Sequence, residues 1–194
     1  MPFNINEMKD NLRFGGARPN LFEVSIQFPT VFGITSKNSE DVKFKVQAAQ
    51  IPPATLGIIQ VPYFGRFLKL AGDRTYPGWQ VNVINDEDFG IRNSMELWSN
   101  AINELAGNKR KKEVDRNSYK TSATVTQYGK SGDRIRQYEF VGIFPAQVGD
   151  IALDWSNVDQ IELFPVLFEY DYWKVVSVGA ASSGVSPSGL AIGE

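Results

Sequence analysis

Apolar and polar residues alternate along much of the chain, which is the pattern of half-buried β-strands. In YPGWQVNVI (76–84), for example, the side chains of Trp79, Val81 and Val83 fall on one face. The chain is therefore predicted to be mainly β. The other predicted strand segments are LFEVSIQFP (21–29), VKFKVQAAQ (42–50), GIIQVPYFGRFLKLAG (57–72, two short strands broken near Pro62 to Gly65), TSATVTQYG (121–129), RIRQYEFVGIF (134–144) and QIELFPVLFEYDYW (160–173).

One stretch has the periodicity of a helix instead. Its apolar residues recur at spacings of four, three, four and three, which places them in one stripe along an amphipathic helix. We therefore predict a helix at about 87–106, with Gly107 and Asn108 as its C-cap, packed against a sheet of mostly antiparallel strands. The residues of the stripe are Ile91, Met95, Trp98, Ile102 and Leu105.

Two local features refine the predicted sheet. GKSGD (129–133) lies between two strand segments and contains the glycines that a tight hairpin turn uses. Pro165 falls inside a strand segment, and it predicts an edge strand or a bulge because proline cannot donate a ladder hydrogen bond. An open sheet edge attracts another chain unless it is covered, so Pro165 is a first indication of assembly.

The two ends of the chain differ in composition from its middle. Residues 1–20 mix charged residues with Asn and Gly, and they are predicted to form an N-terminal arm with little core of its own. Residues 21–173 contain the strand and helix patterns and are predicted to form a single domain. Residues 174–194 are rich in Gly, Ser and Ala, which is typical of a flexible tail that a partner subunit would hold in place.

The composition argues against most common catalytic designs. The chain has 194 residues, no His, no Cys and a formal net charge of -2. It therefore lacks an imidazole base, a thiol nucleophile and the usual ligands of structural zinc. The phosphate-binding patterns GxxxxGK[ST] and GxGxxG are absent as well. We expect no enzyme activity, cofactor or metal, and we expect neither a signal peptide nor a membrane span, which needs roughly 18–20 apolar residues.

Three consecutive acids, Asp86, Glu87 and Asp88, precede the predicted helix. One interpretation is a metal site or a general acid–base pair, and a hydrolase that used Asp73 and Asp86 would require a pocket where these two meet. The simpler interpretation is helix capping. In this interpretation Asn85 or Asp86 caps the first free amide, and the next two acids stabilise the positive end of the helix dipole.

Two charged groups are candidates for contacts between subunits. Asp73 and Arg74, in AGDRTYPGW, either close a tight turn with an internal ion pair or reach a neighbouring chain. A basic run follows the predicted helix, and without interleaved aromatic residues it fits a solvated loop or an acidic patch on a partner better than it fits nucleic acid. The residues of this run are Lys109, Arg110, Lys111 and Lys112.

Four longer stretches, in this order, match a known family from about residue 17 to residue 173. They are ARPNLFEVSI (17–26), VPYFGRFLKLAGDRTYPGWQVNVINDED (61–88), KTSATVTQYG (120–129) and VGIFPAQVGDIALDWSNVDQIELFPVLFEYDYW (141–173). With these stretches the chain resembles the tail tube proteins of contractile-tailed bacteriophages of the T-even type. The basic run and the Gly/Ser-rich C-terminal tail depart from the family pattern.

The resemblance implies a β-sandwich or rolled β-barrel with one flanking helix, similar to the tube proteins of type VI secretion systems. It implies a virion protein, assembled in the host cytoplasm, whose rings of six subunits stack head to tail into a hollow tube. DNA would pass through the lumen without specific binding. The implied partners are further copies of this chain, the tail sheath protein, and the baseplate and tail terminator proteins. A baseplate tube initiator or a secretion-system tube ring protein is the alternative.

The mild acidity of the chain suits a conduit for DNA, because a cationic lumen would hold the phosphates. Our hypothesis is a lumen of net negative charge, with Lys109 to Lys112 facing neighbouring rings or the sheath. Asp73 and Arg74 are further candidates for the contact between subunits.

Overall fold

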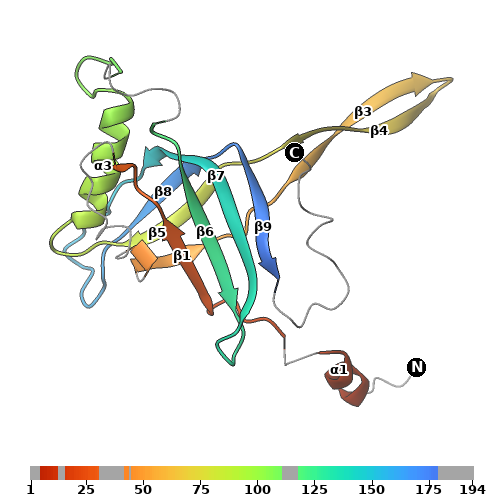
Figure 1. The fold of residues 1–194 in the computed structure, drawn as a ribbon, viewed down its shortest axis with the longest axis horizontal. Coiled ribbons are helices and arrows are strands. Elements are labelled where there is room, and N and C mark those ends of the chain that lie inside the picture. Colours follow the sequence, from red (N-terminus) through yellow and green to blue (C-terminus); the bar gives the residue numbers. More distant parts are fainter. Residues whose placement is uncertain (1–4, 13–15, 31–41, 44, 111–117, 179–194) are drawn as a thin grey trace.

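The computed structural model describes residues 5–12, 16–30, 42–43, 45–110 and 118–178 (Figure 1). The strands of this part of the chain pair in antiparallel fashion, as predicted. The helices discussed below are α1 (Ile5–Asn11) and α3 (Gly90–Ile102). The strands are β1 (Phe22–Ile26), β2 (Val46–Ala49), β3 (Thr55–Tyr63), β4 (Arg66–Thr75), β5 (Trp79–Ile84), β6 (Thr121–Tyr128), β7 (Arg134–Val148), β8 (Leu163–Glu169) and β9 (Tyr172–Val178).

The strands of the main sheet follow the order β1-β6-β7-β8-β5-β2, and β9 also pairs with β7. The long strand β7 is shared, because its first part lies between β6 and β9 and its last part pairs with β8. Figure 1 shows that the strands around β6 and those around β5 run in clearly different directions. This rolled, two-layer arrangement confirms the expected β-sandwich or rolled barrel with one flanking helix.

Gly142 marks the point at which β7 changes its partner. β7 pairs with β9 as far as Val141 and with β8 from Phe144 onward. Gly142 has a φ of 72°, which favours glycine, and a Cβ there would overlap the carboxylate of Asp171. That carboxylate accepts hydrogen bonds from Lys120 Nζ at 2.6 and 2.9 Å. A side chain at this position would therefore disturb both the backbone and the ion pair.

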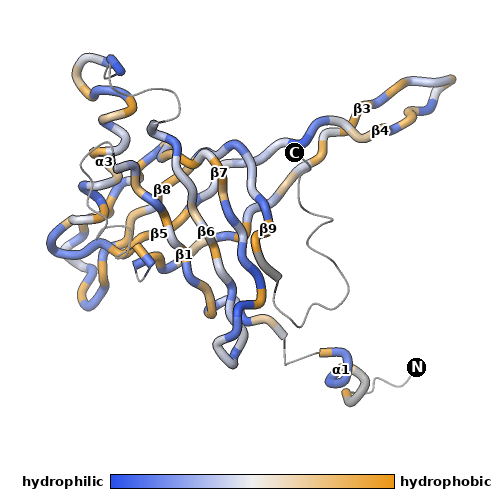
Figure 2. Tube along the Cα trace, in the orientation of Figure 1, coloured by the Kyte–Doolittle hydropathy of each residue, from blue (hydrophilic) through white to orange (hydrophobic). Residues whose placement is uncertain are grey.

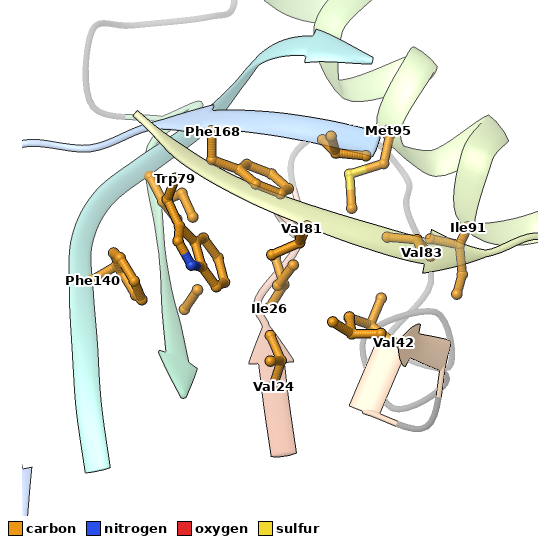
Figure 3. Close-up of a cluster of buried hydrophobic side chains, with 14 of the residues drawn as sticks. Val24, Ile26, Val42, Trp79, Val81, Val83, Ile91, Met95, Phe140 and Phe168 are labelled. Atoms are coloured by element: carbon orange, nitrogen blue, oxygen red, sulfur yellow. The ribbon is translucent and has the colours of Figure 1, made fainter. Parts of the chain in front are cut away.

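The core lies between the two layers and includes Trp79 (Figure 3). The Trp79 ring stacks on Phe140 with the ring centroids 4.2 Å apart, and its centroid lies 5.8 Å from that of Phe168. The indole N–H donates to the carbonyl of Gln50 at 2.8 Å, so the polar group of this side chain is satisfied. The predicted apolar faces of the first strand and of the strand 76–84 are confirmed by the burial of Val24, Ile26, Val81 and Val83.

Helix α3 covers one side of this core, as its apolar stripe predicted. Ile91, Met95 and Trp98 are buried, and Figure 3 shows Ile91 and Met95 pointing from the helix toward the sheet. The Trp98 ring makes an edge contact with Phe28 at 5.8 Å between centroids, and its Nε1 donates to the carbonyl of Tyr119 at 2.9 Å. The helix is therefore held against the sheet by apolar packing and by side-chain hydrogen bonds from Trp98 and Arg92.

The helix is shorter than predicted at both ends. It begins at Gly90 rather than at about 87, and it ends at Ile102 because the backbone of Asn103 is extended, with φ −149° and ψ 121°. Leu105, which was predicted to belong to the apolar stripe, lies beyond the helix and is 89% exposed. Asn108, a predicted cap residue, instead adopts a φ of 49° in the turn that follows.

Pro165 is not on an edge strand, so that prediction is wrong. It lies in β8, which runs between β7 and β5. The ladder between β7 and β8 ends with the pair Val148 and Val166, and the carbonyl of Pro165 then accepts the N–H of Gly149 at 2.7 Å. The proline cannot return a hydrogen bond to the Gly149 carbonyl, and that carbonyl instead accepts one from Arg92 Nη1 at 3.0 Å. The register shift in this ladder lies on β7, at 145–147.

Segment 42–50 is only partly a strand. β2 covers its second half, from Val46, whereas Val42 and Lys43 are helical. Val42 is nevertheless buried in the core, as the alternation predicted. Phe44 lies outside the described residues.

The described residues toward the two ends of the chain differ in how they pack. Figure 1 shows α1 apart from the sheets, and its side chains Ile5 and Met8 are exposed. At the other end β9 continues to Val178, so the beginning of the predicted tail is strand. The remainder of that tail, 179–194, lies outside the described residues.

Tyr170 has a perturbed pKa that makes folding stability depend on pH. Its hydroxyl is buried and has no hydrogen-bond partner among the described residues. Burial, followed by the negative charge of Glu169, raises the pKa of Tyr170 from 10.0 to about 12. As the pH rises, the unfolded chain therefore loses the Tyr170 proton at a lower pH than the folded chain does. The stabilising contribution is complete below pH 10.0 and disappears as the pH rises to about 12.

We expect Tyr170→Phe to flatten this loss of stability at alkaline pH. At neutral pH the variant should be at least as stable as the unsubstituted chain, because an unpaired buried hydroxyl costs about 1–3 kcal/mol. Urea unfolding at a series of pH values measures both effects. A variant that is less stable by more than about 1 kcal/mol at neutral pH would show that the hydroxyl has a partner.

Candidate assembly interface

Strands β3 and β4 form a hairpin that projects from the body of the molecule (Figure 1). The strands have 9 and 10 residues, so the two strands predicted for 57–72 are confirmed and are longer than expected. Every residue of both strands is exposed except Gly72, which is half-buried. Because a two-stranded ribbon is only marginally stable in water, this hairpin has the form of an arm that binds another surface.

One face of the hairpin is apolar and the other is mixed. Residues that pair directly across two antiparallel strands point to the same face. The apolar pair Val61 and Leu68 is therefore followed by the polar pair Gln60 and Lys69 on the opposite face. We call the first surface the apolar face. Its residues are Ile59, Val61, Tyr63, Leu68 and Leu70, with Arg66 at its outer end.

The apolar face is too large and continuous for an ordinary solvent-facing ribbon. Tyr63 is 69% exposed and Leu68 is 57% exposed. At the tip, Phe64 is exposed as well and contacts Tyr63 edge to face. Figure 2 shows hydrophobic segments along both strands out to the region of the tip. Contiguous exposed apolar surface of this kind marks an interaction site.

A bulge lies near the base of the hairpin. The strand register shifts beyond Leu56, and a Cβ on Gly72 would meet the backbone of Gly57 at 3.1 Å. Close backbone approach therefore explains the two glycines. Asp73 lies in β4 at this bulge, and Arg74 pairs with Leu56. Both are strand residues, so the tight turn predicted for them is wrong.

The hairpin carries net positive charge. Arg66, Lys69 and Arg74 are exposed basic residues, and Asp73 is the acidic residue among them. Within the described ranges neither Asp73 nor Arg74 takes part in an ion pair. The internal ion pair that was one alternative for these two residues is therefore not formed, and their contact with a neighbouring chain stays a prediction.

The predicted helix cap at Asn85 or Asp86 is wrong. The cap position of α3 is Phe89, which has a left-handed φ of 52° and makes no side-chain cap bond. Asn85 is buried, and its Nδ2 donates to Glu162 Oε2 at 2.9 Å. Asp88 instead accepts the N–H of the first helical residue at Oδ1, at 3.0 Å. A carboxylate therefore accepts an N–H of the first helical turn, but this carboxylate belongs to Asp88, which lies in the turn before the helix.

The structure does not bring Asp73 and Asp86 together. Asp73 lies in the hairpin that precedes β5, whereas Asp86 follows the opposite end of β5 and forms an ion pair with Lys45. The pocket that a hydrolase using both carboxylates would require is therefore not formed. No three acidic side chains of the described segments gather as metal ligands.

Among the described helices, none is long and apolar enough to cross a bilayer.

The basic run after α3 is described only in part. Lys109 and Arg110 are exposed, and the Arg110 guanidinium lies 5.5 Å from the centroid of the Tyr119 ring, a cation–π distance. Lys111 and Lys112 lie outside the described residues. The role of this run at a subunit contact stays a prediction.

Comparison with known proteins decides the family. Residues 17–176 match the family described as phage tail tube protein. The chain belongs to this family. It is 32% identical to tail tube protein gp19 of Enterobacteria phage T4 over 163 residues, which are 81% of this chain and 91% of the relative. The resemblance seen in the sequence is thus confirmed, and as a tail tube protein the chain is a structural component of the phage virion.

Solved structures share the fold of this tail tube protein. The tube-terminating cap of the anti-feeding prophage superposes with a TM-score of 0.60 at 14% identity, and the match covers 84% of this chain and 92% of that chain. A chain of the PVC sheath–tube complex, an extracellular contractile injection system in its extended state, has a TM-score of 0.54 at 13% identity, with coverages of 88% and 97%. These likenesses show that the rolled β fold is shared across nearly the full length of each chain.

Proposed function

We propose that this tail tube protein polymerises with further copies of itself into stacked rings, which form the hollow inner tube of a contractile phage tail. The observation that carries the proposal is the hairpin, in which every residue of β3 and all of β4 except Gly72 are exposed. Burying its apolar face against another copy stabilises the assembly, because exposed apolar surface is unfavourable in water.

Proteins of the same fold occur in assemblies of this kind. One terminates a tube, one belongs to a sheath–tube complex, and one belongs to the 6-fold symmetrised baseplate of the anti-feeding prophage. By analogy, we place six copies in each ring, the sheath protein around the tube, and baseplate and terminator proteins at its ends. The role is structural, with no catalytic step, cofactor or metal.

We also propose that the lumen is net negative, so that DNA passes without specific binding. The chain has a formal net charge of -2, and a cationic channel would retain phosphate groups through counterion release. Asp73, Arg74 and the run Lys109 to Lys112 then face neighbouring subunits or the sheath. A structure of the tube with that run lining the channel would contradict this arrangement.

Electron microscopy of the purified full chain, alone and after addition of baseplates, tests the proposed function. We expect long hollow tubes with rings repeating along the axis. Rings that stop after one layer on the baseplate would contradict a tube subunit and would indicate a tube initiator. A chain that stays monomeric in sedimentation velocity even with baseplates present would contradict both functions.

A further inference from the structure

A second exposed apolar surface lies between β7 and β8. We call this segment, residues 149–162, the acidic loop. Its side chains Leu153, Val158 and Ile161 are each more than two-thirds exposed, and Trp155 is fully exposed. A fully exposed tryptophan is unusual on a protein surface, because its side chain has a very large apolar area that burial would stabilise. The acidic loop is therefore a candidate contact surface in its own right.

The acidic loop holds Trp155 in a defined turn. Asp154 Oδ1 accepts hydrogen bonds from the backbone N–H of Ser156 at 2.9 Å and from its hydroxyl at 2.8 Å. The N–H of Asn157 donates to the carbonyl of Asp154 at 3.1 Å. These bonds from Ser156 also lower the pKa of Asp154, so the carboxylate stays charged at neutral pH. Trp155 is thus presented by an ordered turn, which reduces the entropy cost of binding.

The charge of the acidic loop is opposite to that of the hairpin. Asp150, Asp154 and Asp159 are exposed, and the loop contains neither Lys nor Arg. The hairpin, in contrast, presents exposed Arg66 at the outer end of its apolar face and exposed Lys69 on its opposite face. Each surface therefore combines exposed apolar side chains with charges that complement the other surface.

The two surfaces lie at opposite ends of the same pair of strands. The hairpin leads into β5 at Trp79, which pairs with Phe168, whereas the acidic loop leads into β8 at Leu163, which pairs with Ile84. Figure 1 shows the hairpin projecting from one side of the molecule, and β8 starting on the opposite side near α3. The hairpin and the acidic loop of the same chain therefore cannot contact each other.

We propose that the acidic loop of one copy receives the hairpin of the next copy. This inference rests on the proposed function, and it names the partner surface of the hairpin. The apolar face packs against Trp155 and Leu153, with Arg66 toward the carboxylates of the loop. Lys69, on the opposite face, adds to the positive charge of the hairpin. Because the two surfaces differ and lie at opposite ends, the contact is heterologous, and its repetition generates a ring or a filament rather than a closed pair.

Charge reversal on each surface tests the proposal. The hairpin variant is Arg66→Glu with Lys69→Glu, and the loop variant is Asp150→Lys with Asp159→Lys. Asp154 is left unchanged, because it holds the turn. Each variant alone should raise the concentration needed for polymerisation at least about tenfold, since like charges across an interface are strongly unfavourable. Light scattering measures this concentration, and electron microscopy identifies the product.

An equal mixture of the two variants should polymerise again. The acidic hairpin of the first variant then meets the basic loop of the second, and the unchanged surfaces meet each other in the alternate contacts. The chain that carries all four substitutions should likewise recover polymerisation. Recovery in both cases would show that the two surfaces contact each other, because two unrelated defects would not compensate.

A matched control changes the charge elsewhere. Lys130→Glu with Arg134→Glu makes the same change of net charge at the turn between β6 and β7, where both residues are exposed, and it should leave polymerisation unchanged. Loss of polymerisation in this control, or failure of the mixture to recover, would overturn the proposal. Both outcomes are distinct from failure of the proposed function, which would appear as absence of tubes from the unsubstituted chain.

Discussion

Replacing Val61 and Leu68 by threonine is expected to prevent tube formation while leaving the subunit folded. The two residues pair directly on the apolar face of the hairpin, and both are exposed in the isolated subunit. Threonine keeps the preference for strand but removes apolar area from the contact. Burial of each such side chain contributes about 1.5–3 kcal/mol. Because about 1.4 kcal/mol corresponds to a tenfold change in an equilibrium constant, the critical concentration for polymerisation should rise about a hundredfold or more.

A control on the opposite face makes the prediction specific. Gln60→Thr with Lys69→Arg changes the neighbouring pair but keeps its polar character and its charge. It should polymerise like the unsubstituted chain. Far-UV circular dichroism and the urea midpoint should be the same for both variants, since none of the four residues belongs to the core. Normal tubes from the Val61/Leu68 variant would rule out the apolar face as the assembly contact.

Trp98→Ala is expected to have the largest effect on folding. The side chain is fully buried between α3 and the sheet, with Phe28 and Phe168 as ring neighbours. Its removal leaves a cavity and deprives the carbonyl of Tyr119 of its donor at 2.9 Å. Large-to-small changes of this kind cost about 3–5 kcal/mol. Urea unfolding measures the loss.

The adjacent residue provides a matched control. Leu97 lies on the same helix and is 55% exposed, so Leu97→Ala should change the free energy of unfolding by at most about 0.5 kcal/mol. Both measurements belong in the assembly-blocked Val61→Thr and Leu68→Thr background, because polymerisation would otherwise add to the apparent stability. A loss of less than about 1 kcal/mol for Trp98→Ala would show that α3 does not depend on this contact.

Side-chain periodicity predicted most of the fold, because burial of one face is set by residues that are close in the sequence. Trp79 and Val81 share a face through the geometry of a single strand. The helix ends were not predictable in the same way. Leu105 continues the helical spacing in the sequence, yet the extended backbone of Asn103 directs it away from the core.

The position of a strand within the sheet was also not predictable from nearby residues. From its missing N–H alone, Pro165 is predicted to lie on an edge strand or at a bulge. Its place depends on the length of β7, which ends before reaching it, and on the N–H of Gly149, which bonds to its carbonyl. Both are long-range properties of the sheet. A prediction made from the proline and its own strand cannot take these long-range properties into account.

The candidate interface was only partly visible in the sequence. Segment 57–72 contains apolar neighbours such as Ile58 and Ile59, which place apolar side chains on both faces of a strand. That pattern is typical of a strand that is buried on both faces. The sequence does not show whether the burying surface belongs to the same chain or to another one. Likewise, Trp155 helped to identify the family, but its full exposure appears only in the structure.

The position of the hairpin determines how the subunit carries mechanical load. The hairpin enters β5 at Trp79, and the acidic loop enters β8 at Leu163, at the other end of the same antiparallel pair. Tension applied between these two surfaces pulls the strands past each other along their length. The pairs from Trp79 and Phe168 to Ile84 and Leu163 then bear the force together in shear and do not open one after another. A filament linked through these two points would transmit axial force through the whole ladder between β5 and β8.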